Sequence, residues 1–177
     1  MARHEALKYD NIAMLRMAKC GSPNTEFVMP QTPSLRTDTV ANHPNDPTHK
    51  ITSDVTVYNP NASCHQSLKP WMNTGVVATK ADAIKNSKYQ AAAKKERKVD
   101  FHPVAFESYG AWSNEAKKYI KKISKLHGSR LRPDLWSPTS TTFMSYWLQR
   151  ISTTLRRTQA ELILDTYTSH NLEDHLC

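Results

Sequence analysis

Two short runs of alternating residues, SLRTDTV at 34–40 and ITSDVTVY at 51–58, constrain the fold more than any other part of the sequence. Their period of two and their β-branched residues are typical of strands. The segment between them, ANHPNDPTHK, is rich in proline, asparagine and aspartate, which predicts a loop over 41–50. We therefore expect two neighbouring strands, each of which carries one aspartate, Asp38 or Asp54, that is costly to bury.

The other segments predict helices and further strands around this pair. Helices are expected at 3–19, 78–98, 113–128 and 140–165, and strands at 26–29 and 99–107. Pro103 favours an edge position or a bulge for the last strand, because proline cannot donate a ladder hydrogen bond. This order predicts an α/β fold with a mixed sheet flanked by helices and extra C-terminal helices.

The last two expected helices have distinct faces. The helix at 113–128 has an apolar stripe on one side and five lysines, including Lys122, on the other. Residues 129–138 are rich in proline and predict a linker, so we expect a sheet-containing domain at 1–128 and a linker with a helical extension at 129–177. In that extension one helical face carries the apolar residues Phe143, Trp147, Ile151, Leu155 and Leu162.

The composition favours a polyanionic partner. The chain has 177 residues and a formal net charge of +8, which suits binding to the phosphates of DNA or RNA but also serves simple solubility. The three cysteines are far apart, which argues against a disulfide framework. We find no signal peptide and no apolar run long enough to span a bilayer. We therefore expect an intracellular protein with no membrane partner and no small-molecule substrate.

The two aspartates are the main candidates for a catalytic site. A hairpin could bring Asp38 and Asp54 to the same face of neighbouring strands, where two carboxylates repel each other unless a cation lies between them. Mg²⁺ prefers one or two carboxylates with water and a substrate phosphate, and it activates water for phosphodiester cleavage. Alternatively, Asp38 points to solvent and Asp54 caps the loop before its strand, and spacing alone favours this second interpretation.

Lysines on the helix at 78–98 are candidates to complete this site. Lys85 and Lys88 are three residues apart and share a helix face, so one of them could reach a phosphate held at the aspartates. The alternative is a solvated lysine face. The end of this helix carries four basic residues suited to sequence-independent contacts with the nucleic-acid backbone, namely Lys94, Lys95, Arg97 and Lys98.

Six segments, taken in order, resemble a known family. They are ARHEAL, SLRTDTV, ITSDVTVYNP, GVVATKADAIKNSKY, VDFHPVAFESYGAWSNEA and SYWLQRISTTLRRTQAELIL. Together they are similar to the restriction-like endonuclease domain at the carboxyl end of non-LTR retrotransposon reverse transcriptases. The resemblance covers nearly the whole chain and depends on the order of the motifs rather than on any single one.

This resemblance implies a restriction-endonuclease-like fold, a nuclear location and a Mg²⁺-dependent activity that nicks DNA for primed reverse transcription. It implies that Asp38 and Asp54 hold the metal and that Lys85 or Lys88 stands in for the catalytic lysine. It also places Arg3 and His4 on a helix beside the site, in contact with nucleic acid.

The sequence departs from the family pattern at two positions. Thr37 replaces the proline of the Pro-Asp pair, and Thr56 replaces the lysine of the Asp-x-Lys pattern. A non-catalytic remnant that still binds nucleic acid is therefore the alternative function. A decayed fragment that folds poorly is a third possibility.

Overall fold

The computed structural model describes residues 3–128 and 140–174, which form an α/β fold on one four-stranded mixed sheet. The order of helices and strands is the one that the sequence predicts. The linker expected at 129–138 lies outside the described residues. The elements are α1 (Arg3–Met17), β1 (Gly21–Met29), β2 (Thr32–His43), β3 (Asp46–Tyr58), the 3₁₀ helix η1 (Ser63–Leu68), α2 (Val76–Lys95), β4 (Val99–Glu107), α3 (Asn114–His127) and α4 (Phe143–Asp174).

The strands are arranged in the order β1-β2-β3-β4. β1, β2 and β3 form an antiparallel meander, while β3 and β4 run parallel and α2 provides the crossover between them. β4 is an edge strand, which is one of the two alternatives predicted from Pro103.

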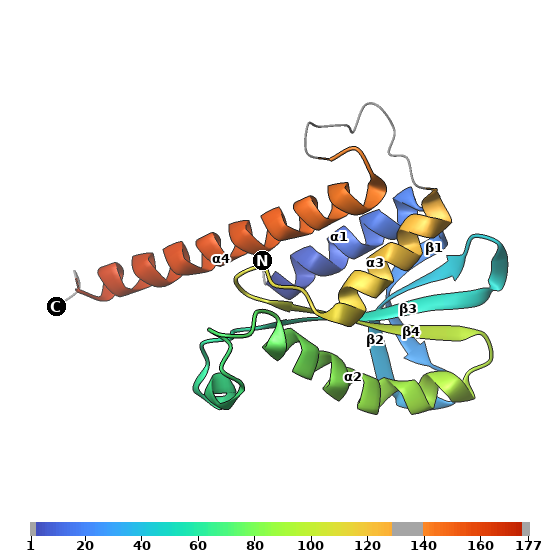
Figure 1. Cartoon of the computed structure of the whole chain (residues 1–177), viewed down its shortest axis with the longest axis horizontal. Coiled ribbons are helices and arrows are strands. Elements are labelled where there is room, and N and C mark those ends of the chain that lie inside the picture. The colour runs from blue at the N-terminus through green and yellow to red at the C-terminus, as the bar shows by residue number, and fades with distance from the viewer. Residues whose placement is uncertain (1–2, 129–139, 175–177) are drawn as a thin grey trace.

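Helices cover both faces of this sheet (Figure 1). α1 and α3 pack on one face with α4 against α1, and α2 crosses the other face. The main apolar core lies under α1, α3 and α4, where Ile51 and Val55 of β3 meet Ile120 and Trp147. The α2 face has smaller apolar clusters, in which Tyr89 packs on Phe101 and alanines fill much of the remaining contact.

The prediction of a loop over residues 41–50 is wrong. β2 continues to His43 and β3 begins at Asp46, so the hairpin turn is much shorter than expected. The polar residues that suggest a loop occupy the ends of the two strands, where the Asp46 carboxylate accepts hydrogen bonds from the backbone and hydroxyl of Thr48. The helix predicted at 78–98 likewise ends earlier, at Lys95, because the chain turns through Lys98 at a φ of 60° to enter β4.

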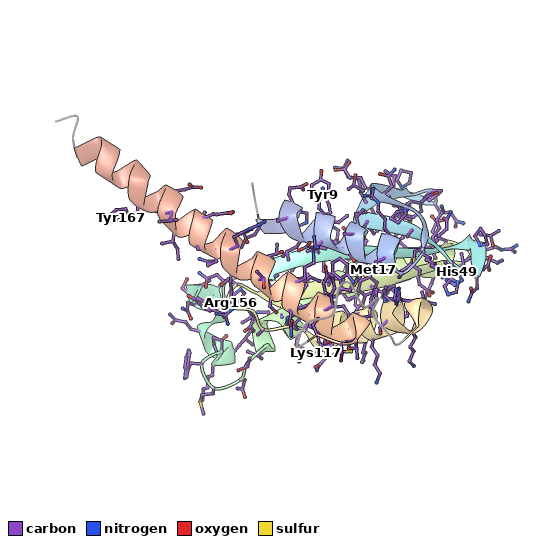
Figure 2. The ribbon with its side chains drawn as sticks, turned by 90° about the horizontal axis from the view of Figure 1, so that it is seen from above. Tyr9, Met17, His49, Lys117, Arg156 and Tyr167 are labelled. Atoms are coloured by element: carbon purple, nitrogen blue, oxygen red, sulfur yellow. The ribbon has the colours of Figure 1, made fainter. Side chains whose placement is uncertain are left out.

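Two side chains depart from the predicted helix faces. Lys122 is half-buried rather than turned to solvent, because its ammonium reaches Asp100 at 2.5 Å and His102 at 3.0 Å. Leu162 is 48% exposed, although four of the apolar residues predicted to share its face are buried. The reason is that α4 extends past the other elements, as the position of Tyr167 in Figure 2 shows. None of the helices in the described ranges has an apolar stretch of the length that a bilayer crossing requires.

Candidate active site

The two aspartates lie where β2 and β3 separate. The ladder between these strands ends at the pair Thr39–Ser53, and Asp38 and Asp54 are the next residues on each strand. One step beyond the ladder, the Asp38 carboxylate accepts a hydrogen bond from the backbone amide of Val55 at 2.7 Å. At this point the Asp38 side chain, instead of a backbone carbonyl of β2, accepts the hydrogen bond from β3. This contact holds the Asp38 carboxylate beside the residue that follows Asp54.

Asp54 lies on the face of the sheet that α2 covers, while the Asp38 carboxylate lies at the gap between the two strands. Their neighbours Thr39 and Ser53 point to the opposite face, where the Asn11 amide of α1 donates to both hydroxyls at 2.9 and 2.6 Å. Asp54 is in the middle of β3 and only 5% exposed. The interpretation of Asp54 as a cap on the preceding loop is therefore wrong.

Of the two candidate lysines, Lys85 is the one that contacts an aspartate. Its ammonium lies 3.0 and 2.9 Å from the two carboxylate oxygens of Asp54. Lys88 is exposed, and its ammonium lies 5.0 Å from the centroid of the Tyr89 ring. The two lysines are one helical turn apart, but they contact different groups: Lys85 contacts Asp54 and Lys88 lies over the Tyr89 ring.

Two carboxylates and one ammonium group lie close together at this site. Burial of Asp54 and the nearby Asp38 carboxylate raise the pKa of Asp54 above its usual value, and the Lys85 ammonium opposes this rise. Burial and the charge of Asp54 also raise the pKa of Tyr89, so its hydroxyl stays neutral. That hydroxyl donates to the backbone carbonyl of Arg36 at 2.9 Å and ties α2 to β2 where β2 leaves β3.

The first residues of α1 take different directions. His4 Nε2 lies 2.9 Å from Asp38 Oδ2, so this imidazole is part of the site. The Arg3 guanidinium donates to the Gln159 side chain of α4 instead. Of the two residues predicted beside the site, His4 contacts a candidate metal ligand and Arg3 joins two helices.

The four basic residues at the end of α2 are all exposed, and one of them forms an ion pair. Lys94, Lys95 and Arg97 are exposed, whereas Lys98 forms an ion pair with Asp46 at 3.1 Å. The one acidic residue of α2, Asp82, is 4% exposed, so it contributes little negative charge to the outer surface. The outer face of α2 is therefore basic, and we call its exposed lysines, Lys80, Lys88, Lys94 and Lys95, the α2 basic face.

Sequence reasoning missed the residue that fixes α2 in place. The Glu107 carboxylate, at the end of β4, accepts hydrogen bonds from the amides of Val77 and Ala78 at 2.9 and 3.4 Å. A carboxylate at this position satisfies free amides and complements the helix dipole. Glu107 thereby fixes the start of the helix that carries Lys85, and no local signal in the sequence connects it with residues thirty positions earlier.

The donor set suits a hard cation. Across residues 3–128 and 140–174, no group of three or more His, Cys, Asp or Glu side chains is arranged to hold a metal. Two carboxylates are nevertheless sufficient for Mg²⁺, which usually keeps several waters and binds substrate phosphate. The raised pKa of Asp54 fits such a role, because added positive charge would relieve the repulsion between the carboxylates.

No protein-family model and no curated protein matches the chain. The geometry of Asp38, Asp54 and Lys85 is therefore the main evidence on function. This geometry combines two adjacent carboxylates, one of them buried, with an ammonium group and a neighbouring basic surface. In chemical terms, carboxylates are ligands that suit a cation and an ammonium group suits a phosphate.

Proposed function

We propose that this chain is a Mg²⁺-dependent endonuclease domain of restriction-endonuclease-like fold, derived from a retroelement, that nicks DNA in the nucleus. The observation that carries the proposal is the contact of the Lys85 ammonium with both oxygens of Asp54, at 3.0 and 2.9 Å, beside Asp38. Phosphodiester cleavage needs positive charge near the phosphate and an activated water. Lysine at this position supports the proposal despite Thr56, because the amine comes from α2 instead of from β3.

Each residue of the site has a separate role in this proposal. Asp38 and Asp54 would hold Mg²⁺, which when bound lowers the pKa of water and stabilises charge on the phosphate. Lys85 balances the charge of Asp54 in the free protein and offers its ammonium to a non-bridging phosphate oxygen when DNA is bound. His4 and the Val55 amide both contact Asp38 Oδ2 and so orient that carboxylate.

Nicking of a supercoiled plasmid by the purified chain tests this proposal. With Mg²⁺ we expect open-circular DNA to form, and we expect Asp54→Asn to lower the rate by about 100-fold, as is typical for the loss of a group that stabilises charge in a transition state. The matched control is Glu161→Gln, which removes an exposed carboxylate on α4 and should leave the rate unchanged. If the wild-type chain does not nick, or if Asp54→Asn nicks equally well, the catalytic proposal fails.

The α2 basic face supports a second candidate, a non-catalytic module that binds nucleic acid. Its lysines do not depend on the aspartates, so binding to duplex DNA or RNA should survive in the double variant Asp38→Asn/Asp54→Asn. Counterion release predicts a steep loss of affinity between about 50 and 200 mM salt. Fluorescence anisotropy with labelled duplexes measures this dependence, and normal binding by a chain that never nicks would favour the second candidate.

A further inference from the structure

A hollow of about 340 Å³ opens where β3 and β4 end and α2 begins. Three separate segments line it: the chain after β3 with Asn61, the turn before α2 with Trp71, and the chain after β4 with Tyr109. The hollow is therefore a product of the fold rather than of one flexible loop. Its inner wall includes Glu107, whose carboxylate already accepts the amides of Val77 and Ala78.

Two large aromatic side chains at this hollow are exposed. Trp71 is 70% exposed and Tyr109 is 58% exposed, and Met72 beside Trp71 is 71% exposed. The Asn61 amide donates to the Tyr109 hydroxyl at 2.9 Å, which holds that ring in place. Exposed aromatic side chains gathered at a concave site are typical of a binding surface.

The hollow and the candidate active site lie along the same elements. Asp54 is four residues before the end of β3, which corresponds to about 13 Å. Lys85 is ten residues after Gly75, which corresponds to about 15 Å along α2. These lengths match about four nucleotides of a stacked strand.

The charge between the two places suits a nucleic-acid backbone. Lys80 is exposed on the first turns of α2, between the hollow and Lys85, and Lys69 is exposed two residues before Trp71. A backbone that follows α2 would therefore meet ammonium groups on the way from the hollow to the active site.

We propose that this hollow binds an unpaired base of the DNA that is nicked at Asp54, and that the base stacks on Trp71 with Tyr109 at its side. The inference rests on the proposed function, since it takes DNA as the substrate. Stacking on an aromatic ring tolerates every base, so the hollow recognises strand structure and not sequence. The preferred substrate is then a duplex with a short unpaired stretch a few nucleotides from the nick.

Binding to two labelled duplexes tests the inference, one fully paired and one identical except for a short unpaired stretch. The measurement is made without divalent metal, so its result does not depend on nicking. We expect the wild-type chain to bind the partly unpaired duplex about 10-fold more tightly, because stacking of a base contributes this much. Trp71→Ala should remove the preference and leave binding to the paired duplex unchanged, whereas Trp71→Phe keeps a ring and should retain most of it.

A second variant keeps the test independent of the turn that carries Trp71. Tyr109→Leu changes a different wall of the hollow and should weaken the same preference, with thermal melts to show that each variant folds. Equal binding of the two duplexes by the wild-type chain, or an undiminished preference in Trp71→Ala, would overturn the inference. A clear preference in a chain that never nicks would instead contradict the proposed nuclease activity and leave the binding site in place.

Discussion

The two faces of the sheet bury different kinds of side chain. On the α1 face, apolar side chains from three helices and the sheet form one continuous core. Under α1 this core includes a neutral hydrogen-bonded group, in which the Asn11 amide donates to the hydroxyls of Thr39 and Ser53. On the α2 face, there are two small apolar clusters and a buried aspartate, Asp54. The Asp54 carboxylate contacts the Lys85 ammonium and lies near the Asp38 carboxylate. Residues that alternate along β2 and β3 contribute to both faces.

The α1 face therefore contributes most of the stability of the fold, and the α2 face carries the charged residues of the candidate site. Burial of apolar surface is the main source of stability, and most of it is found on the α1 face. The α2 face can then hold charges that cost free energy to bury, because the other face already fixes the strands. Variants on the two faces should therefore affect different measurements.

The largest effect on stability is expected from the α1 face. Ile120 of α3 is 0% exposed in the main core, so Ile120→Ala should lower the free energy of unfolding by about 2–5 kcal/mol. Tyr89→Phe, on the α2 face, removes one hydroxyl contact to Arg36 and should cost only about 1 kcal/mol. Chemical denaturation measures both, and equal losses would contradict the assignment of the core to the α1 face.

The next effect concerns activity and compares two lysines on one helix. Lys85→Ala should lower the nicking rate by about 100-fold, because the ammonium at Asp54 is lost. Lys88→Ala removes an equal charge one turn away and should change the rate only severalfold, because Lys88 lies over the Tyr89 ring. Rates on a supercoiled plasmid distinguish them, and equal losses would show that the lysines act only as surface charge.

A smaller effect is expected from pH, with opposite signs on the two sides of the sheet. Burial raises the pKa of Asp82 on α2 to about 6, so the folded state holds this proton more tightly and stability falls as pH rises from about 4 to 6. Burial and the nearby Lys122 lower the pKa of His102 on β4 to about 4. The unfolded state therefore takes up that proton first, and stability falls as pH drops from about 6.5 to 4.

Two variants isolate these contributions. As pH rises from about 4 to 6, the free energy of unfolding of Asp82→Asn should increase by about 1–2 kcal/mol relative to that of the wild-type chain. His102→Gln should remove a loss of similar size that the wild-type chain shows as pH drops from about 6.5 to 4. Urea denaturation across this range is the measurement. A pH profile that neither variant changes would show that these two groups are not perturbed by the fold.

The sequence predicts the order of helices and strands because apolar periodicity and turn residues act locally. It also places Asp38, Asp54 and Lys85 among the candidate residues, because alternation along a strand and helix spacing are readable from the chain. It does not choose between Lys85 and Lys88, which depends on how α2 is rotated on the sheet. Nor does it reveal the cap by Glu107 or the hollow at Trp71 and Tyr109, because these join segments that are far apart in sequence.

The most direct test of the central claim is to locate a bound divalent cation. Mn²⁺ can replace Mg²⁺ and broadens nearby amide signals in NMR spectra. Added to the wild-type chain with a short DNA duplex, it should first broaden the amides of Asp38, Asp54 and Val55, and Asp38→Asn/Asp54→Asn should abolish this selectivity. Broadening that is absent, spread over the surface, or unchanged in the double variant would contradict a metal site at the two aspartates.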